Sequence, residues 1–215
     1  MERLPEVRAH SSLFASVQLC VVYVLIECAL WSSRSALRNR WALLAALTVV
    51  AFVLVDRPSF RRLGLDLPGA RGVITVLAVS AAAIIFLIGS MLRLGGQIDS
   101  SAALSNLHGS SGYVIWALIQ EFLLQSFFFT RCEDVFGSST AVWAAATLFA
   151  LAHIPNLLLT TFAFVGGLFF CEMFRRYRSI YPLAIAHAAL GLTVALTMPD
   201  SLMHHMRAGI GYLRY

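Results

Sequence analysis

The sequence contains no lysine, so all sixteen of its Lys and Arg side chains are arginine, and charged residues of both signs make up only 13% of the chain. Ordinary globular domains have about 25% charged residues. The arginines are dispersed between apolar runs, which excludes a soluble domain with a basic face for binding nucleic acid. Hydrophobic residues make up 59% of the 215 positions. The composition therefore indicates a protein whose solvent is the lipid bilayer.

The sequence has few cysteines and no internal repeats. The four cysteines form no CxxC pair, and they fall within or at the edges of apolar runs, where a free cysteine behaves as a small hydrophobe. They are Cys20, Cys28, Cys132 and Cys171. No repeat is visible, so the duplicated halves that mark many transporters are missing. We expect a single integral membrane domain over residues 1–215, without disulfides.

Long apolar runs recur along the chain, and several approach the roughly 20 residues that a helix needs to cross a bilayer. They are Leu13–Trp31, Trp41–Val55, Gly72–Leu92, Gly112–Thr130, Thr140–Ala152, Leu157–Phe174 and Ile180–Met198. The first run is too long for a signal peptide and no A-x-A cleavage pattern follows it, so we expect it to stay as a helix. The predicted fold is an all-α, polytopic transmembrane bundle of about seven spans.

The arginines between spans predict an orientation. Those that follow spans two, four and six favour the cytosolic side for these loops and for the N-terminus, since the loop from Gly95 to Ser111 has no basic residue except His108. They are Arg57, Arg61, Arg62, Arg71, Arg131, Arg175, Arg176 and Arg178. Other arginines, such as Arg34 and Arg93, argue for the opposite orientation.

Ionisable residues inside apolar spans are costly, by about 2.5–3.5 kcal/mol each at a helix centre on insertion scales, and they indicate function by default. The candidates are Glu27, Glu121, His153, Glu172 and His187. Glu172 has Arg175 and Arg176 one turn away and is expected to pair with them at the interface. Glu27 lies near a helix end. Neither is a strong candidate for a functional site.

Glu121 has polar neighbours on its own helix. Gln125 follows at i+4 and therefore lies beside it, whereas Gln120 is rotated by about 100°. These three residues are expected to face protein or a water-filled cavity rather than lipid. Interhelical hydrogen bonding alone is a competing interpretation of the cluster.

Two further segments carry histidines. In FALAHIPN, Phe149–Asn156, the side chains of Phe149 and His153 share a helix face and Pro155 ends the helix. In YPLAIAHAALG, Tyr181–Gly191, His187 lies about two turns into the last span. A carboxylate and two histidines on three helices could activate water and stabilise a developing charge.

These segments resemble the three motifs of the CAAX-protease and bacteriocin-processing (CPBP) family of intramembrane proteases, including the type II CAAX prenyl endopeptidases. QEFLLQSFFFTRCEDVFG is similar to the first motif, EExxxR, FALAHIPN to the second, FxxxH, and the region around His187 to the third, HxxxN. FRRLGLDLPG, Phe60–Gly69, resembles a basic segment that often precedes the core helices. The family-like core covers about residues 112–198.

The resemblance implies a multi-pass endopeptidase that acts on a membrane-associated protein or peptide. It implies a location in the bacterial cytoplasmic membrane. It also implies that the leading glutamate and the second-motif histidine activate water, while the third-motif histidine and asparagine stabilise the oxyanion. Here Gln120 stands for the leading glutamate, Gln125 for the arginine and Gly191 for the asparagine. Glutamine cannot act as a general base, and glycine has no side-chain donor.

We therefore expect the catalytic residues to be Glu121, His153 and His187, with Gln120, Gln125, Phe149 and Gly191 in support. Glu121 would be the base with His153 as its partner, and His187 would stabilise the oxyanion. No cofactor is expected, although two histidines and a carboxylate also suit zinc. The alternative function is that of a catalytically inactive family member that binds a membrane partner as an immunity or assembly factor.

Overall fold

The computed structural model describes residues 5–94 and 112–214, and the regular elements of this part of the chain are all helices, without strands. The first elements are α1 (Pro5–Trp31), α2 (Ser35–Asp56), α3 (Phe60–Leu63) and α4 (Ala70–Arg93). The fourth span, Gly112–Phe136, joins a helix at residues 112–121 to the π-helix η1 (Phe122–Phe129) and to α6 (Thr130–Phe136). The remaining elements are α7 (Ser138–Leu151), α8 (Leu157–Tyr177), α9 (Tyr181–Thr197), α10 (Asp200–Met203), η2 (His204–Met206) and α11 (Ile210–Leu213).

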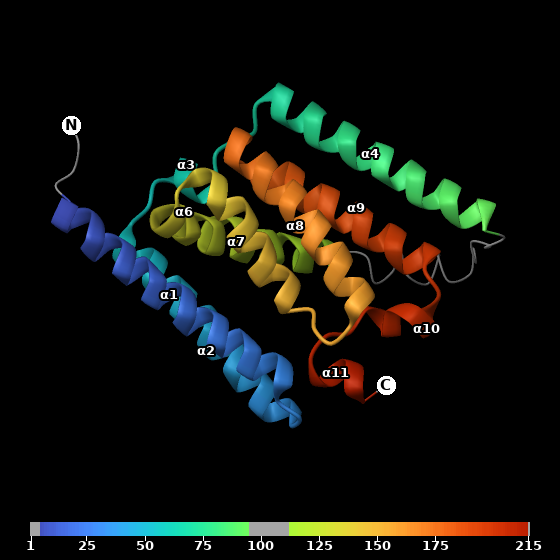
Figure 1. The fold of residues 1–215 in the computed structure, drawn as a ribbon, viewed down its shortest axis with the longest axis horizontal. Coiled ribbons are helices and arrows are strands. Elements are labelled where there is room, and N and C mark those ends of the chain that lie inside the picture. The colour runs from blue at the N-terminus through green and yellow to red at the C-terminus, as the bar shows by residue number, and fades with distance from the viewer. Residues whose placement is uncertain (1–4, 95–111, 215) are drawn as a thin grey trace.

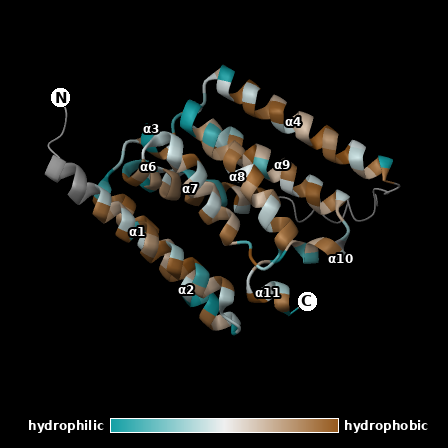
Figure 2. Ribbon diagram, in the orientation of Figure 1, coloured by the Kyte–Doolittle hydropathy of each residue, from teal (hydrophilic) through white to brown (hydrophobic). Residues whose placement is uncertain are grey.

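The predicted all-α membrane bundle is confirmed. Within the described residues, five helical segments are long and apolar enough to cross a bilayer, and the shorter helices α7 and α9 are also apolar. In Figure 1, α1 and α2 form an antiparallel hairpin along one side, α4 packs against α9 on the other side, and α7 and α8 lie between them. Hydrophobic residues predominate along α1, α2 and α4 (Figure 2), and many of their large apolar side chains are exposed, as in lipid-facing helices.

The residues Leu63, Gly64 and Leu65 of the FRRLGLDLPG segment hold the end of α3 against the turn between α8 and α9. Gly64 has φ +72°, and a Cβ at this position would lie 2.3 Å from the Phe174 ring. Its carbonyl accepts a hydrogen bond of 3.0 Å from the Ile180 amide. Only glycine meets both the dihedral angle and this close approach. Ion pairs between Arg62 and Asp134 and between Arg178 and Glu133 join the same end of the bundle.

Arg131 does not lie in a loop, so its assignment to a connection between spans four and five is wrong. The residue lies within α6, is 3% exposed and has its Nη2 atom 2.7 Å from Oδ2 of Asp56. Its Nε atom donates a hydrogen bond of 3.0 Å to Oε1 of Gln18. Arg131 therefore ties the α1–α2 hairpin to the fourth span. The predicted orientation loses one of its arginines and stays a prediction, and the loop Gly95–Ser111 with His108 lies outside the described residues.

The other polar residues lie close to their expected positions. Glu172 pairs with Arg175 and Arg176, as predicted. Glu27 accepts a hydrogen bond of 3.1 Å from Nε1 of Trp31 in the last turn of α1. The four cysteines are free.

Helix α7 is too short to cross the hydrocarbon layer. Its 14 residues cover about 21 Å at 1.5 Å each, compared with about 30 Å for the layer. The turn at residues 152–156 must therefore find partners for its backbone within the protein. The C-terminal segment supplies one of them, since the Gly209 amide donates to the Ile154 carbonyl at 2.8 Å. The side chain of Asn156 also binds this segment, because its Nδ2 donates to the Met203 carbonyl at 2.8 Å. The turn that carries the partly buried His153 is thus held against the C-terminal segment.

Candidate active site

The candidate active site begins with the pair Glu121 and Gln125. Both side chains are 0% exposed, and Nε2 of Gln125 donates a hydrogen bond of 3.1 Å to Oε2 of Glu121, as their i, i+4 spacing predicted. The π-helix η1 starts directly after Glu121. Such π-turns change the direction of side chains along a helix and are frequent at functional sites. The second oxygen of Glu121 is thereby left for a partner on another helix.

That partner is His187 of α9. Its Nδ1 atom lies 2.8 Å from Oε1 of Glu121, and its side chain is 13% exposed. The Phe170 ring stacks on the imidazole at 5.2 Å between centroids, and the Phe149 ring meets it edge-on at 6.0 Å. A carboxylate accepts, so Nδ1 of His187 carries the proton and Nε2 of the neutral ring is an acceptor.

His153 is oriented by its own helix. Its Nδ1 atom lies 2.6 Å from the Phe149 carbonyl oxygen, which can only accept, so the proton is again on Nδ1 and the Nε2 lone pair is free. The Phe149 and His153 rings lie 4.8 Å apart, which agrees with the shared face predicted from their spacing. The two histidines thus have the same tautomer, fixed by two different acceptors.

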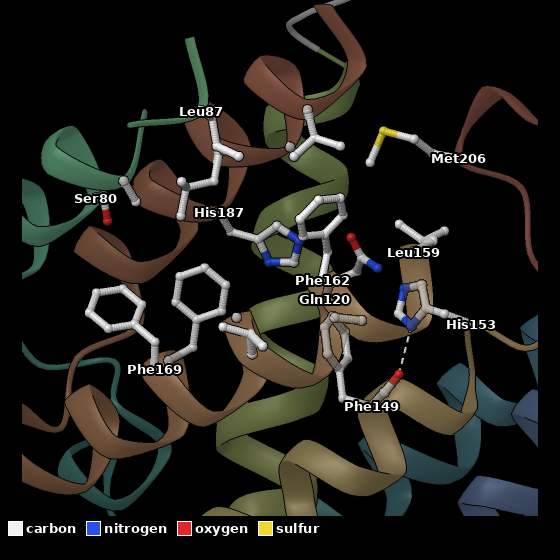
Figure 3. A pocket seen from close by; sticks show the side chains of 18 of the residues that line it. Ser80, Leu87, Gln120, Phe149, His153, Leu159, Phe162, Phe169, His187 and Met206 are labelled. Atoms are coloured by element: carbon white, nitrogen blue, oxygen red, sulfur yellow. Dashed lines mark hydrogen bonds between the residues drawn. The ribbon is translucent and has the colours of Figure 1, made fainter. Parts of the chain in front are cut away.

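Five of the seven predicted site residues line one cavity of about 460 Å³, namely Gln120, Phe149, His153, His187 and Gly191. His187, His153 and Gln120 line it, and Figure 3 shows their side chains pointing into it from three elements. Most of the other lining residues are apolar. They include Phe86 and Leu87 of α4, Phe162 and Phe169 of α8, and Leu190 and Val194 of α9. The few polar groups therefore converge in surroundings of low dielectric.

Glu121 and Gln125 are not on the wall of this cavity. Glu121 lies behind His187, and among the described residues its carboxylate is hydrogen-bonded to His187 and Gln125 rather than to His153. The carboxylate thus acts on the cavity through an imidazole. The sequence spacing placed Glu121 on the correct helix face but did not identify its partner, because helix-to-helix contacts have no periodicity in the sequence.

No motif indicated Tyr113, and Asn156 ends the second-motif segment without a role predicted for it. Tyr113 lines the cavity, and Asn156 is a buried residue whose Oδ1 accepts a hydrogen bond of 3.1 Å from the Leu159 amide at the start of α8. Asn156 stands next to Pro155 before an apolar run, which is a recognisable helix-start signal. Gly191, the third departure from the family motif, also lines the cavity.

Within the ranges 5–94 and 112–214, no group of three His, Cys, Asp or Glu side chains is close enough to hold a metal ion. Glu121 and His187 form a pair, and the carbonyl of Phe149 rather than a third ligand engages Nδ1 of His153. The expectation of a cofactor-independent site stays a prediction.

The comparisons with known proteins agree with the motifs. No curated protein and no solved structure matches the chain. The family model described as type II CAAX prenyl endopeptidase Rce1-like matches residues 104–193. This segment includes Glu121, His153 and His187, whereas the part of the cavity wall that α4 supplies lies outside it. The resemblance predicted from the three motifs is confirmed for residues 104–193, where this integral membrane protein is similar to the type II CAAX prenyl endopeptidase family model.

Proposed function

We propose that this protein is an intramembrane endopeptidase in which His187, held by Glu121, activates water to hydrolyse a peptide bond of a membrane-associated protein or peptide. The observation that carries this proposal is the hydrogen bond of 2.8 Å between Nδ1 of His187 and Oε1 of the fully buried Glu121. A buried carboxylate that holds an imidazole is the arrangement that makes histidine an effective general base.

His187 provides the proton transfer. Its Nε2 atom takes a proton from water as the water oxygen attacks the scissile carbonyl carbon, and Glu121 stabilises the imidazolium that forms. The same Nε2–H then gives the proton to the leaving amine as the carbon–nitrogen bond breaks. Glu121 does not touch the substrate and is a positioning residue.

His153 and Gln120 act on the other side of the reaction. With its proton on Nδ1, His153 offers the Nε2 lone pair to the second hydrogen of the attacking water and so orients it. The Gln120 amide lines the same cavity and has two N–H donors for the oxyanion, which is the one role that glutamine can fill where a glutamate base is absent.

The cavity also supports a substrate that arrives from the lipid. Its wall includes Phe86, Trp116 and Val165, whose side chains are exposed on the apolar surface between α4, the fourth span and α8. An extended segment with an apolar side chain or anchor could fill such a site. The substrate class is therefore a membrane-associated polypeptide.

The test compares cleavage by the wild type, His187→Ala and His153→Ala in liposomes that contain peptides with a hydrophobic anchor, with fragments identified by mass spectrometry. We expect each variant to lose at least about a hundredfold in rate, the usual contribution of a general base. The matched control is His205→Ala, because His205 is an exposed histidine of η2. Equal cleavage by wild type and His187→Ala would overturn the proposal.

Binding without cleavage is the alternative that the three motif departures favour, since Gln120, Gln125 and Gly191 each lack a group that the family motif has. A binding factor would retain the apolar cavity and its affinity for an anchored peptide when His187 is replaced. Co-purification of the same membrane partner by wild type and His187→Ala, without fragments in either sample, would support this function.

A further inference from the structure

Gly191 and Tyr113 are in unusually close contact. A Cβ atom built on Gly191 would lie 1.9 Å from the Tyr113 hydroxyl oxygen and 2.8 Å from Cζ of the same ring. Atoms cannot approach so closely, so glycine is the residue that lets this phenol reach the α9 backbone. The space next to Cα of residue 191 is therefore occupied by a hydroxyl group from the start of the fourth span.

This hydroxyl lies in the proposed active site. Gly191 follows His187 by four residues, which puts both on one face of α9. Tyr113, His187, Gln120 and Gly191 line the same cavity. Within the described part of the chain, the Tyr113 hydroxyl makes no hydrogen bond, so its proton is available to a ligand in the cavity.

We propose that Tyr113 is a catalytic residue whose hydroxyl donates a hydrogen bond to the oxyanion and replaces the side-chain donor that Gly191 lacks. This inference rests on the proposed function. The phenol O–H donates and keeps its proton throughout, so no bond of Tyr113 breaks. Together, Tyr113 and Gln120 supply two neutral donors to the developing negative charge, in an apolar site where such donors are most effective.

The Tyr113 hydroxyl compensates for the asparagine that is missing at position 191, because it fills the space next to Gly191. An asparagine at position 191 would carry its amide into the volume that the Tyr113 hydroxyl occupies. The two residues are therefore alternatives, because the cavity has space for a donor from α9 or from the fourth span at this point. Glycine at position 191 departs from the family motif, and it is also the residue that leaves room for the Tyr113 hydroxyl.

Tyr113→Phe separates donation from packing, since the variant retains the ring and removes only the hydroxyl. We expect kcat to fall by about 10²–10³, the usual effect of losing one oxyanion donor, with little change in KM. Tyr181→Phe is the matched control. Tyr181 donates its hydroxyl to the Leu65 carbonyl at 3.2 Å, away from the cavity, and its loss should leave cleavage unchanged.

A swap of the two positions gives a second measurement. Tyr113→Ala removes the donor, and Tyr113→Ala with Gly191→Asn offers an amide in the vacated space. We expect the double variant to recover at least tenfold of the rate lost in Tyr113→Ala. Gly191→Asn alone puts its side chain against the tyrosine hydroxyl, so its rate should be lower than that of the double variant.

The outcomes separate this inference from the function on which it rests. Cleavage that needs His187 but is equal in wild type and Tyr113→Phe would overturn the role of Tyr113 and retain the protease. No His187-dependent cleavage in the wild type would overturn both. Loss of kcat in Tyr113→Phe together with rescue by the asparagine would support the donor role, which ring packing alone does not explain.

Discussion

Replacing Glu121 by glutamine tests the proposed mechanism most directly. The variant retains the volume of the side chain and one acceptor oxygen, but it removes the negative charge that stabilises the His187 imidazolium. It also allows the amide nitrogen to donate to Nδ1 of His187, which moves the ring proton to Nε2 and removes the base.

The magnitude follows from the contact of 2.8 Å between Nδ1 and Oε1. With the charges delocalised over both groups, their separation is about 4 Å, and the attraction is about 4 kcal/mol at an effective dielectric constant of 20. At about 1.4 kcal/mol for each factor of ten, this predicts a fall in kcat of about a thousandfold.

The assay measures initial rates of cleavage in liposomes together with the thermal unfolding midpoint in detergent. We expect the midpoint of Glu121→Gln to be equal to or above that of the wild type, because a buried charge is removed and its hydrogen bonds are retained. Glu172→Gln is the control, since Glu172 pairs with arginines at the end of α8. A rate for Glu121→Gln within threefold of the wild type, at an unchanged midpoint, would refute the reasoning.

Three further outcomes are expected. Gln120→Glu should fold and should cleave at least as fast as the wild type, because residue 120 lines the cavity and a carboxylate there gives the site a second base. If the variant does not fold, Gln120 has a structural role instead. Arg131→Met should lower the unfolding midpoint, since the Asp56 carboxylate loses its positively charged partner. The cost is below the roughly 3–5 kcal/mol of a fully buried pair, because the Asp56 side chain is 28% exposed, and Asp56→Asn in the same chain should restore part of the lost stability. Dialysis against a zinc chelator should leave the cleavage rate unchanged, and a chelator-sensitive rate that added zinc restores would contradict the cofactor-independent site.

The motifs predicted the helices and faces of the site correctly, but not all of its contacts. Burial of Glu121 and Gln125 followed from the high cost of polar groups in lipid, and their mutual hydrogen bond followed from helical spacing. The partnership of Glu121 with His187 instead of His153 depends on how η1 and α9 pack. The same is true of Arg131, which looked like a loop residue because an arginine after an apolar run usually marks the end of a span.

The sequence by itself determined that this protein is a helical membrane bundle and that Glu121, His153 and His187 are the candidate site residues of its family-like core. Composition and 3.6-residue periodicity are local properties of the chain, and polar groups are costly in the bilayer, so both are visible in the sequence. Only the tertiary structure decided which of these groups face the cavity. It put Glu121 behind His187, closed the turn after α7 with the C-terminal segment, and brought the Tyr113 hydroxyl against Gly191. Those contacts join residues far apart in the chain, and they are set by side-chain packing between helices rather than by any spacing along one of them.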